Sequence, residues 1–62
     1  MEDMLTVDDA ARFLQISPKT LRNWVAYKKI PYYKVGGAIR FKTVKLEAWL
    51  RRREFEEAEF SR

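Results

Sequence analysis

The residues of this chain best suited to chemistry are basic, and they gather in its middle. Between Ala10 and Leu46 there are nine lysines and arginines and no acidic residue. A segment of this charge repels itself unless a polyanion neutralises it, so the pattern favours nucleic acid over the alternative of an ordinary solvated surface. The nine are Arg12, Lys19, Arg22, Lys28, Lys29, Lys34, Arg40, Lys42 and Lys45.

Groups for catalysis or metal binding are scarce. The 62 residues include no cysteine and no histidine, which excludes zinc knuckles, disulfide scaffolds and every nucleophile or base built on Cys or His. Except for Glu47, the carboxylates lie in residues 1–9 and 54–62, and we expect no central group to act as a base. We therefore expect a protein that is not an enzyme and that needs no cofactor or metal.

The length allows one small domain, which we expect over residues 1–62 with a core over about 5–52. A composition that is 47% apolar and 15% aromatic supports a core, although not a deep substrate pocket. No apolar run approaches the roughly 20 residues that span a bilayer, and the acidic start is unlike a signal peptide. A cytoplasmic protein without membrane contact is the expectation.

Two helices are predicted in the first half of the chain. Thr6 can cap a helix over about 7–14, in which Val7, Ala10, Ala11 and Leu14 recur at helical spacing. Ser17 followed by Pro18 marks the start of a second helix over about 18–27, because proline at the first position lacks only an N–H that the helix leaves free. The second helix should bury Leu21, Trp24 and Val25.

A β-hairpin is predicted next, around Gly36-Gly37. A two-residue turn would pair Lys34 with Ile39 and mix charge with hydrocarbon on both faces. A three-residue loop over 36–38 pairs Val35 with Ile39 and Tyr33 with Phe41, and it leaves Tyr32, Lys34, Arg40 and Lys42 on the other face. Because a slip of one residue turns every side chain over, we expect the second register.

A third helix should follow, capped by Thr43, with an apolar face of Leu46, Trp49 and Leu50. Trp24 and Trp49 fall in helical apolar stripes, so we expect them in the core rather than as platforms for stacked bases. The Arg51–Arg53 run is expected to be a solvated helix end rather than a DNA contact, and an acidic helical tail over about 54–62 should fray from about residue 57. Tyr32 is balanced between packing over a lysine and contacting DNA.

The fold class expected is mostly α with a small β-hairpin, in the order α-α-β-β-α. A helix, a three-residue break and a second helix with bases on its outer side form a helix-turn-helix. The spaced residues Leu5-Thr6-Val7, Leu14-Gln15-Ile16-Ser17, Ile30-Pro31, Gly36-Gly37 and Leu46-Glu47-Ala48-Trp49-Leu50 resemble the excisionase-type, MerR-like winged helix-turn-helix domains. The resemblance covers about residues 5–50. Gln15 departs from the family, which usually has glycine there, and a turn with positive φ would strain it.

The resemblance implies that the second helix enters the DNA major groove and that the glycine tip, or wing, reaches a flanking groove or the backbone. For base readout and nearby phosphates, the residues of the second helix suggest Ser17, Lys19, Thr20, Arg22, Asn23 and Tyr27. For contacts of the wing and with the sugar-phosphate backbone, the candidates are Lys28, Lys29, Lys34, Gly36, Gly37, Arg40 and Lys42.

The function expected is sequence-specific binding of double-stranded DNA, either as an excisionase-like recombination directionality factor or as a small transcription regulator. The expected partners are an integrase or further copies of the chain on DNA. The expected location is the nucleoid, as for a DNA-binding protein of bacterial or phage type. No small-molecule effector is expected, since only about a dozen residues follow Leu50. Two alternatives remain open: a protein-interaction adaptor acting through Phe55, Phe60 and the acidic tail, and a binder of RNA or single strands.

Overall fold

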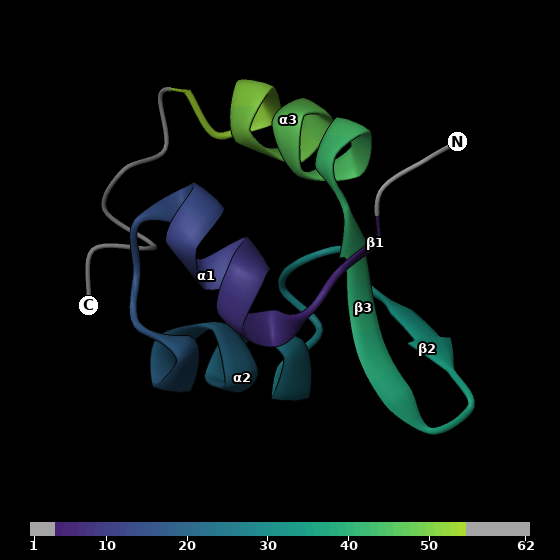
Figure 1. Cartoon of the computed structure of the whole chain (residues 1–62). Helices are drawn as coiled ribbons and strands as arrows, with labels where there is room; N and C mark the ends of the chain where they lie inside the picture. Colours follow the sequence, from purple (N-terminus) through teal and green to yellow (C-terminus); the bar gives the residue numbers. More distant parts are fainter. Residues whose placement is uncertain (1–3, 55–62) are drawn as a thin grey trace.

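The computed structural model describes residues 4–54 of the chain, and within them three helices lie beside a small sheet (Figure 1). The elements are β1 (Met4–Leu5), α1 (Val7–Leu14), α2 (Pro18–Ala26), β2 (Tyr33–Val35), β3 (Ala38–Lys42) and α3 (Thr43–Arg52). The predicted fold class, mostly helical with a hairpin between the second and third helices, is confirmed. The predictions for Phe55, Phe60 and the tail beyond Glu54 lie outside the described residues.

Strand β1 is an element that the sequence analysis did not predict. Its two residues pair antiparallel with β3, with Met4 opposite Lys42 and Leu5 opposite Phe41. The sheet order is therefore β1-β3-β2, with β3 in the centre. A two-residue strand carries too short a pattern to be read from sequence, because only the pairing with β3 defines it.

Helix α1 begins and ends as its sequence predicts. The Thr6 hydroxyl accepts a hydrogen bond from the Asp9 N–H at 3.1 Å. At the other end Gln15 adopts φ 60°, and the N–H groups of Gln15 and Ile16 donate to the carbonyls of Arg12 and Ala11. This pattern is a Schellman motif with glutamine where glycine is usual, so the expected strain at Gln15 is present.

Backbone groups at both ends of helix α2 also form capping hydrogen bonds. Ser17 caps it, accepting from the Thr20 N–H at 3.1 Å, with Pro18 in the first turn. The helix ends with a second Schellman motif, in which Lys28 has φ 57° and the Lys29 N–H donates to the Trp24 carbonyl at 2.8 Å. A lysine in the left-handed region is uncommon, and the sequence analysis did not predict it.

The core lies where the two helices, β3 and α3 meet. Its three largest fully buried side chains are Leu21, Phe41 and Leu46, and each contributes about 1.5–3 kcal/mol through burial. Trp24 and Trp49 are half-buried and pack against this cluster with ring centroids 5.7 Å apart, which confirms that their rings face the core. The core residues are Ala10, Ala11, Leu21, Ile30, Phe41 and Leu46.

Two expectations for α3 are wrong. Thr43 is the first helical residue rather than the cap, because β3 runs into α3 without a loop and places Lys42 at the N-cap position, with no side-chain cap hydrogen bond. Leu50 is 43% exposed, since α3 leaves the core after Trp49. The helix itself ends at Arg52.

The predicted hairpin register is also wrong. The strands pair Tyr33 with Arg40, Lys34 with Ile39 and Val35 with Ala38, around a two-residue turn at Gly36-Gly37. Both glycines have positive φ, +58° and +87°, as in the hairpin turns whose twist matches that of the strands. The turn sets the register here, because the tip is too exposed for the separation of polar and apolar faces to matter: Val35 is 54% exposed.

Candidate nucleic-acid interface

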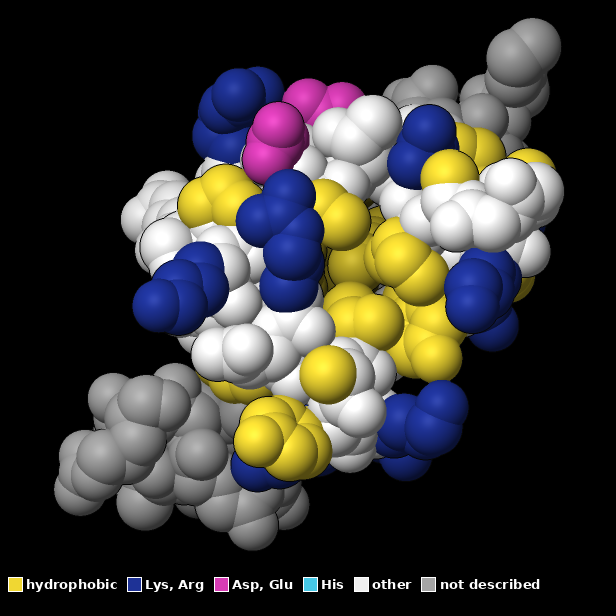
Figure 2. All heavy atoms as spheres, turned by 90° about the horizontal axis from the view of Figure 1, so that it is seen from below, with side chains coloured by type: hydrophobic (Ala, Val, Ile, Leu, Met, Phe, Trp, Pro, Cys, Tyr) yellow, Lys and Arg dark blue, Asp and Glu magenta, His cyan; other side chains and the backbone are white. Residues whose placement is uncertain are grey.

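The outer surface of α2 carries the side chains that the sequence analysis assigned to base readout. Leu21 points into the core, and the opposite side of the helix exposes Lys19, Asn23 and Ala26 along one line, with Arg22 beside it. Figure 2 looks onto the molecule from the side of α2 and shows lysine and arginine side chains spread around hydrophobic ones, with acidic side chains at one edge. The exposed line on α2 is therefore a polar and cationic ridge that the core holds in place.

A small apolar hollow of about 220 Å³ lies between α2 and the hairpin. The hollow is lined by Ile39 of β3, by Val7 of α1 and by three residues of α2, namely Arg22, Val25 and Ala26. Ala26 is a surface residue of α2 that the sequence analysis missed. Helical spacing could have found it, because it follows Lys19 and Asn23 on the same line.

The hydroxyl groups of Ser17 and Thr20 form hydrogen bonds at the N-cap of α2. The Ser17 hydroxyl accepts from the Thr20 N–H and donates to the Thr20 Oγ1 at 2.9 Å. Ser17 is exposed and Thr20 half-buried. Their hydroxyls are thus held at the N-terminal end of α2 with a defined geometry, where the helix dipole favours an anion.

Tyr27, Lys28 and Lys29 follow at the C-terminal end of α2, and all three are exposed. Tyr27 is 73% exposed. The Lys28 ammonium donates to the Tyr32 hydroxyl at 3.4 Å, and Tyr32 packs partly against the core. Tyr32 thus contacts a lysine through its hydroxyl group, and its contact with DNA stays a prediction.

The hairpin does not bring its three cations to one face, as the sequence analysis expected. Lys34 is opposite Ile39 and so lies on the face of the sheet that includes Ile39 and Phe41, toward α2. Arg40 and Lys42 lie on the other face, because neighbours along a strand alternate. There the Arg40 guanidinium donates to the Ile39 carbonyl at 2.8 Å, and the Lys42 ammonium lies 5.1 Å from the Tyr33 ring centroid.

The tip of the hairpin is open. Gly36 and Gly37 are exposed, and a Cβ built on either would meet no atom within 4 Å. The space around the two glycines therefore allows their backbone to approach another molecule closely. Their positive φ angles, rather than crowding, are what select glycine there.

The described part of the chain shows no sign of a metal site, a membrane span or an exposed base-stacking platform. Within residues 4–54 no group of three or more Asp and Glu is placed to hold a metal ion. None of the helices α1 to α3 is both long and apolar enough to cross a bilayer. Trp24 and Trp49, packed against each other and the core, do not form an exposed platform for stacked bases.

A family model described as a helix-turn-helix domain matches residues 4–54, which includes every element from β1 to α3. No curated protein and no solved structure matches the chain.

Proposed function

Because the chain belongs to the helix-turn-helix domain family, we propose that it binds double-stranded DNA in a sequence-specific manner. In this proposal α2 lies in the major groove, and the tip at Gly36-Gly37 lies on a flanking groove or on the backbone. The observation that supports it best is the two-sided construction of α2. One side is anchored in the core by Leu21, and the other exposes Lys19, Asn23 and Ala26 with Arg22 beside them.

The side chains on the outer ridge of α2 suit base edges. Arginine can donate two hydrogen bonds to guanine, and asparagine can exchange two with adenine. We assign these roles to Arg22 and Asn23, with Lys19 reaching a base or phosphate near the helix start. The Ala26 methyl and the apolar hollow beside it suit the methyl group of thymine.

Phosphate contacts come from the two ends of α2 and from the hairpin. Ser17 and Thr20 present hydroxyls and a helix N-terminus to one strand. Tyr27, Lys28 and Lys29 would contact the backbone farther along. On the wing we assign the main contact to Lys34, since it lies on the α2 side of the sheet. Arg40 and Lys42 supply weaker, longer-range attraction from the other face.

Two cellular roles fit this mode of binding. One is an excisionase-like directionality factor that acts beside an integrase, and the other is a small transcription regulator. A single helix-turn-helix covers one half-site, so binding of further copies to adjacent sites is the natural way to gain affinity. Genomic position distinguishes the roles, because an integrase gene next to this one favours excision.

The test is a selection of binding sites from random duplex DNA, followed by titration of alanine variants on the selected site. Arg22→Ala should lower affinity by about 1–3 kcal/mol and relax the preference at one base position. Lys19→Ala and Asn23→Ala should also weaken binding. Arg51→Ala serves as the charge-matched control, since Arg51 is exposed on α3, away from α2. Variants of α2 that bind as well as the wild type would show that α2 does not read DNA.

A further inference from the structure

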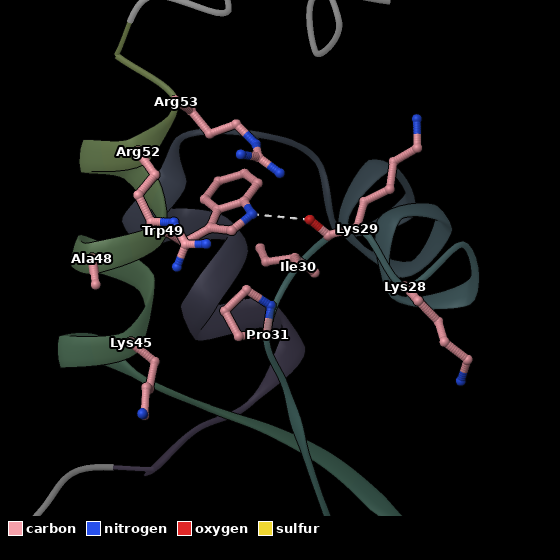
Figure 3. A pocket seen from close by; sticks show the side chains of 9 residues that line it. All are labelled: Lys28, Lys29, Ile30, Pro31, Lys45, Ala48, Trp49, Arg52 and Arg53. Carbon is pink, nitrogen blue, oxygen red and sulfur yellow. Dashed lines mark hydrogen bonds between the residues drawn. The ribbon is translucent and has the colours of Figure 1, made fainter.

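A second cationic site lies away from the outer ridge of α2, in a cleft between α3 and the loop that follows α2 (Figure 3). Its volume is about 460 Å³. Five of its nine lining residues are basic, and none is acidic. The basic residues are Lys28, Lys29, Lys45, Arg52 and Arg53, and the others are Ile30, Pro31, Ala48 and Trp49.

The two walls of the cleft come from distant parts of the sequence. Lys45, Ala48, Trp49 and Arg52 recur at helical spacing, so they share one face of α3. In Figure 3 this face lies opposite the segment 28–31. The guanidinium ends of Arg52 and Arg53 lie beside Trp49, whereas the ammonium ends of Lys28 and Lys29 point away from α3.

The cleft is held in shape by direct contacts across it. The Trp49 indole N–H donates to the Lys29 carbonyl at 2.9 Å, which joins the two walls. The Arg53 guanidinium carbon lies 5.4 Å from the centroid of the Trp49 ring. With Ile30 buried and Pro31 half-buried beside this ring, the cleft combines an apolar floor with a cationic rim.

This combination suits an acidic peptide better than duplex DNA. Carboxylates pair with lysine and arginine at the rim, and an apolar or aromatic side chain can cover the floor. Two of the five basic residues, Lys45 and Arg52, belong to α3, and Arg53 follows at its C-terminal end. In Figure 1 most of α3 lies at the top of the molecule and α2 at the bottom. A duplex held on the outer side of α2 therefore does not account for the charge on α3.

The chain contains a segment of matching chemistry that starts at the rim. We propose that the cleft binds the carboxylate-rich C-terminal segment of the same molecule, residues 54–60. This inference goes beyond DNA binding and does not depend on it. The segment follows directly on Arg53, a lining residue, and contains four glutamates and two phenylalanines: Glu54, Glu56, Glu57, Glu59, Phe55 and Phe60.

Length and tethering favour binding within one molecule. Eight residues follow Glu54, and at 3.3–3.6 Å per residue they reach about 26–29 Å when extended. That reach exceeds the intermediate and short dimensions of the molecule, 23 and 18 Å. A short tether also gives an effective concentration on the order of millimolar, which a separate copy in dilute solution does not match.

The experiment uses the full chain without DNA. The protein has no cysteine, so Ser61→Cys accepts a single nitroxide label, and NMR line broadening reports which amides the labelled segment approaches. Docking should broaden the amides of Lys29 and Ile30, on the wall remote in sequence from the label, far more than those of Gly36 and Gly37. Raising salt from about 0.1 M to about 1 M shortens the Debye length from about 10 Å to about 3 Å and should reverse most of the effect.

Two neighbouring arginines provide the matched variants. Arg52 lines the cleft and Arg51 does not, although both are exposed on α3. Arg52→Gln should restore most of the lost signal at Lys29 and Ile30, whereas Arg51→Gln, with the same loss of charge, should leave the broadening unchanged. Thermal melting of both variants checks that the fold is intact.

Three results would overturn the proposal. Equal effects of the two variants would show only general attraction between the segment and a basic surface. Broadening that appears between a labelled molecule and a separate isotope-labelled one, and vanishes on dilution, would place the segment on a second copy. No broadening at Lys29 and Ile30, with Arg52→Gln weakening random duplex binding more than Arg51→Gln, would make the cleft a DNA phosphate site.

Discussion

The indole N–H of Trp49 donates a hydrogen bond of 2.9 Å to the backbone carbonyl of Lys29, which is 20 residues earlier in the chain. Lys29 is also the residue whose N–H closes the Schellman motif at the end of α2, on the Trp24 carbonyl. The same peptide segment therefore terminates α2 and ties it to α3. Through this contact α3 fixes the direction in which the chain leaves α2.

Trp49→Phe should destabilise the fold by about 1–3 kcal/mol. The phenyl ring keeps much of the apolar contact with Trp24, but the Lys29 carbonyl loses its donor. Urea unfolding measures the change. Val44→Ala, at a position 61% exposed on the same helix, is the control and should stay within about 0.5 kcal/mol of the wild type. An equally stable Trp49→Phe variant would show that this hydrogen bond contributes nothing.

Ser17 allows stability and DNA binding to be separated. Ser17→Ala should cost about 0.5–2 kcal/mol of stability, because the Thr20 N–H loses its acceptor. Ser17→Asp should keep the stability of the wild type, since aspartate is an equally good cap and its charge suits the helix N-terminus. On the proposed interface, however, that charge repels phosphate, so duplex binding should fall sharply. Undiminished binding by Ser17→Asp would remove the start of α2 from the interface.

Lys34 and Arg40 should contribute unequally to duplex binding. Lys34→Ala should weaken binding to all sequences alike. It should also lower the slope of log affinity against log salt concentration by about one. Arg40→Ala should have a smaller effect, because Arg40 lies on the other face of the sheet and already donates to the Ile39 carbonyl. Titrations at several salt concentrations measure both slopes. A larger effect of Arg40→Ala would reverse the assignment of the wing contact.

Gln15→Gly should stabilise the protein by about 1 kcal/mol. Gln15 has φ 60°, a conformation that costs about 1–2 kcal/mol for a residue with a Cβ and almost nothing for glycine. In a domain of this size, the gain corresponds to a rise of about 4–8 °C in Tm. Gln15→Ala keeps the strain and is the control. A Tm of Gln15→Gly at or below that of Gln15→Ala would mean that the strain is not limiting.

The candidate site was predictable from sequence to the extent that it lies on one helix. The positions of Lys19, Arg22 and Asn23 on the outer side of α2 follow from helical spacing relative to Leu21. The same spacing identifies Ala26, although the sequence analysis did not use it. The hairpin was less predictable, because faces in a sheet depend on a register that a single residue can shift. Lys34 therefore lies on the opposite face from Arg40, contrary to the expectation.

The sequence by itself determined what depends on neighbours along the chain. The caps at Thr6 and Ser17 and the strained turn at Gln15 involve residues within about four positions, so local chemistry decides them. Only the tertiary structure decided the β1–β3 pairing, the bond from Trp49 to Lys29 and the gathering of Lys28 and Arg52 around one cleft. These pairs are distant in sequence, and they meet because the buried side chains of three helices and a strand pack in one arrangement.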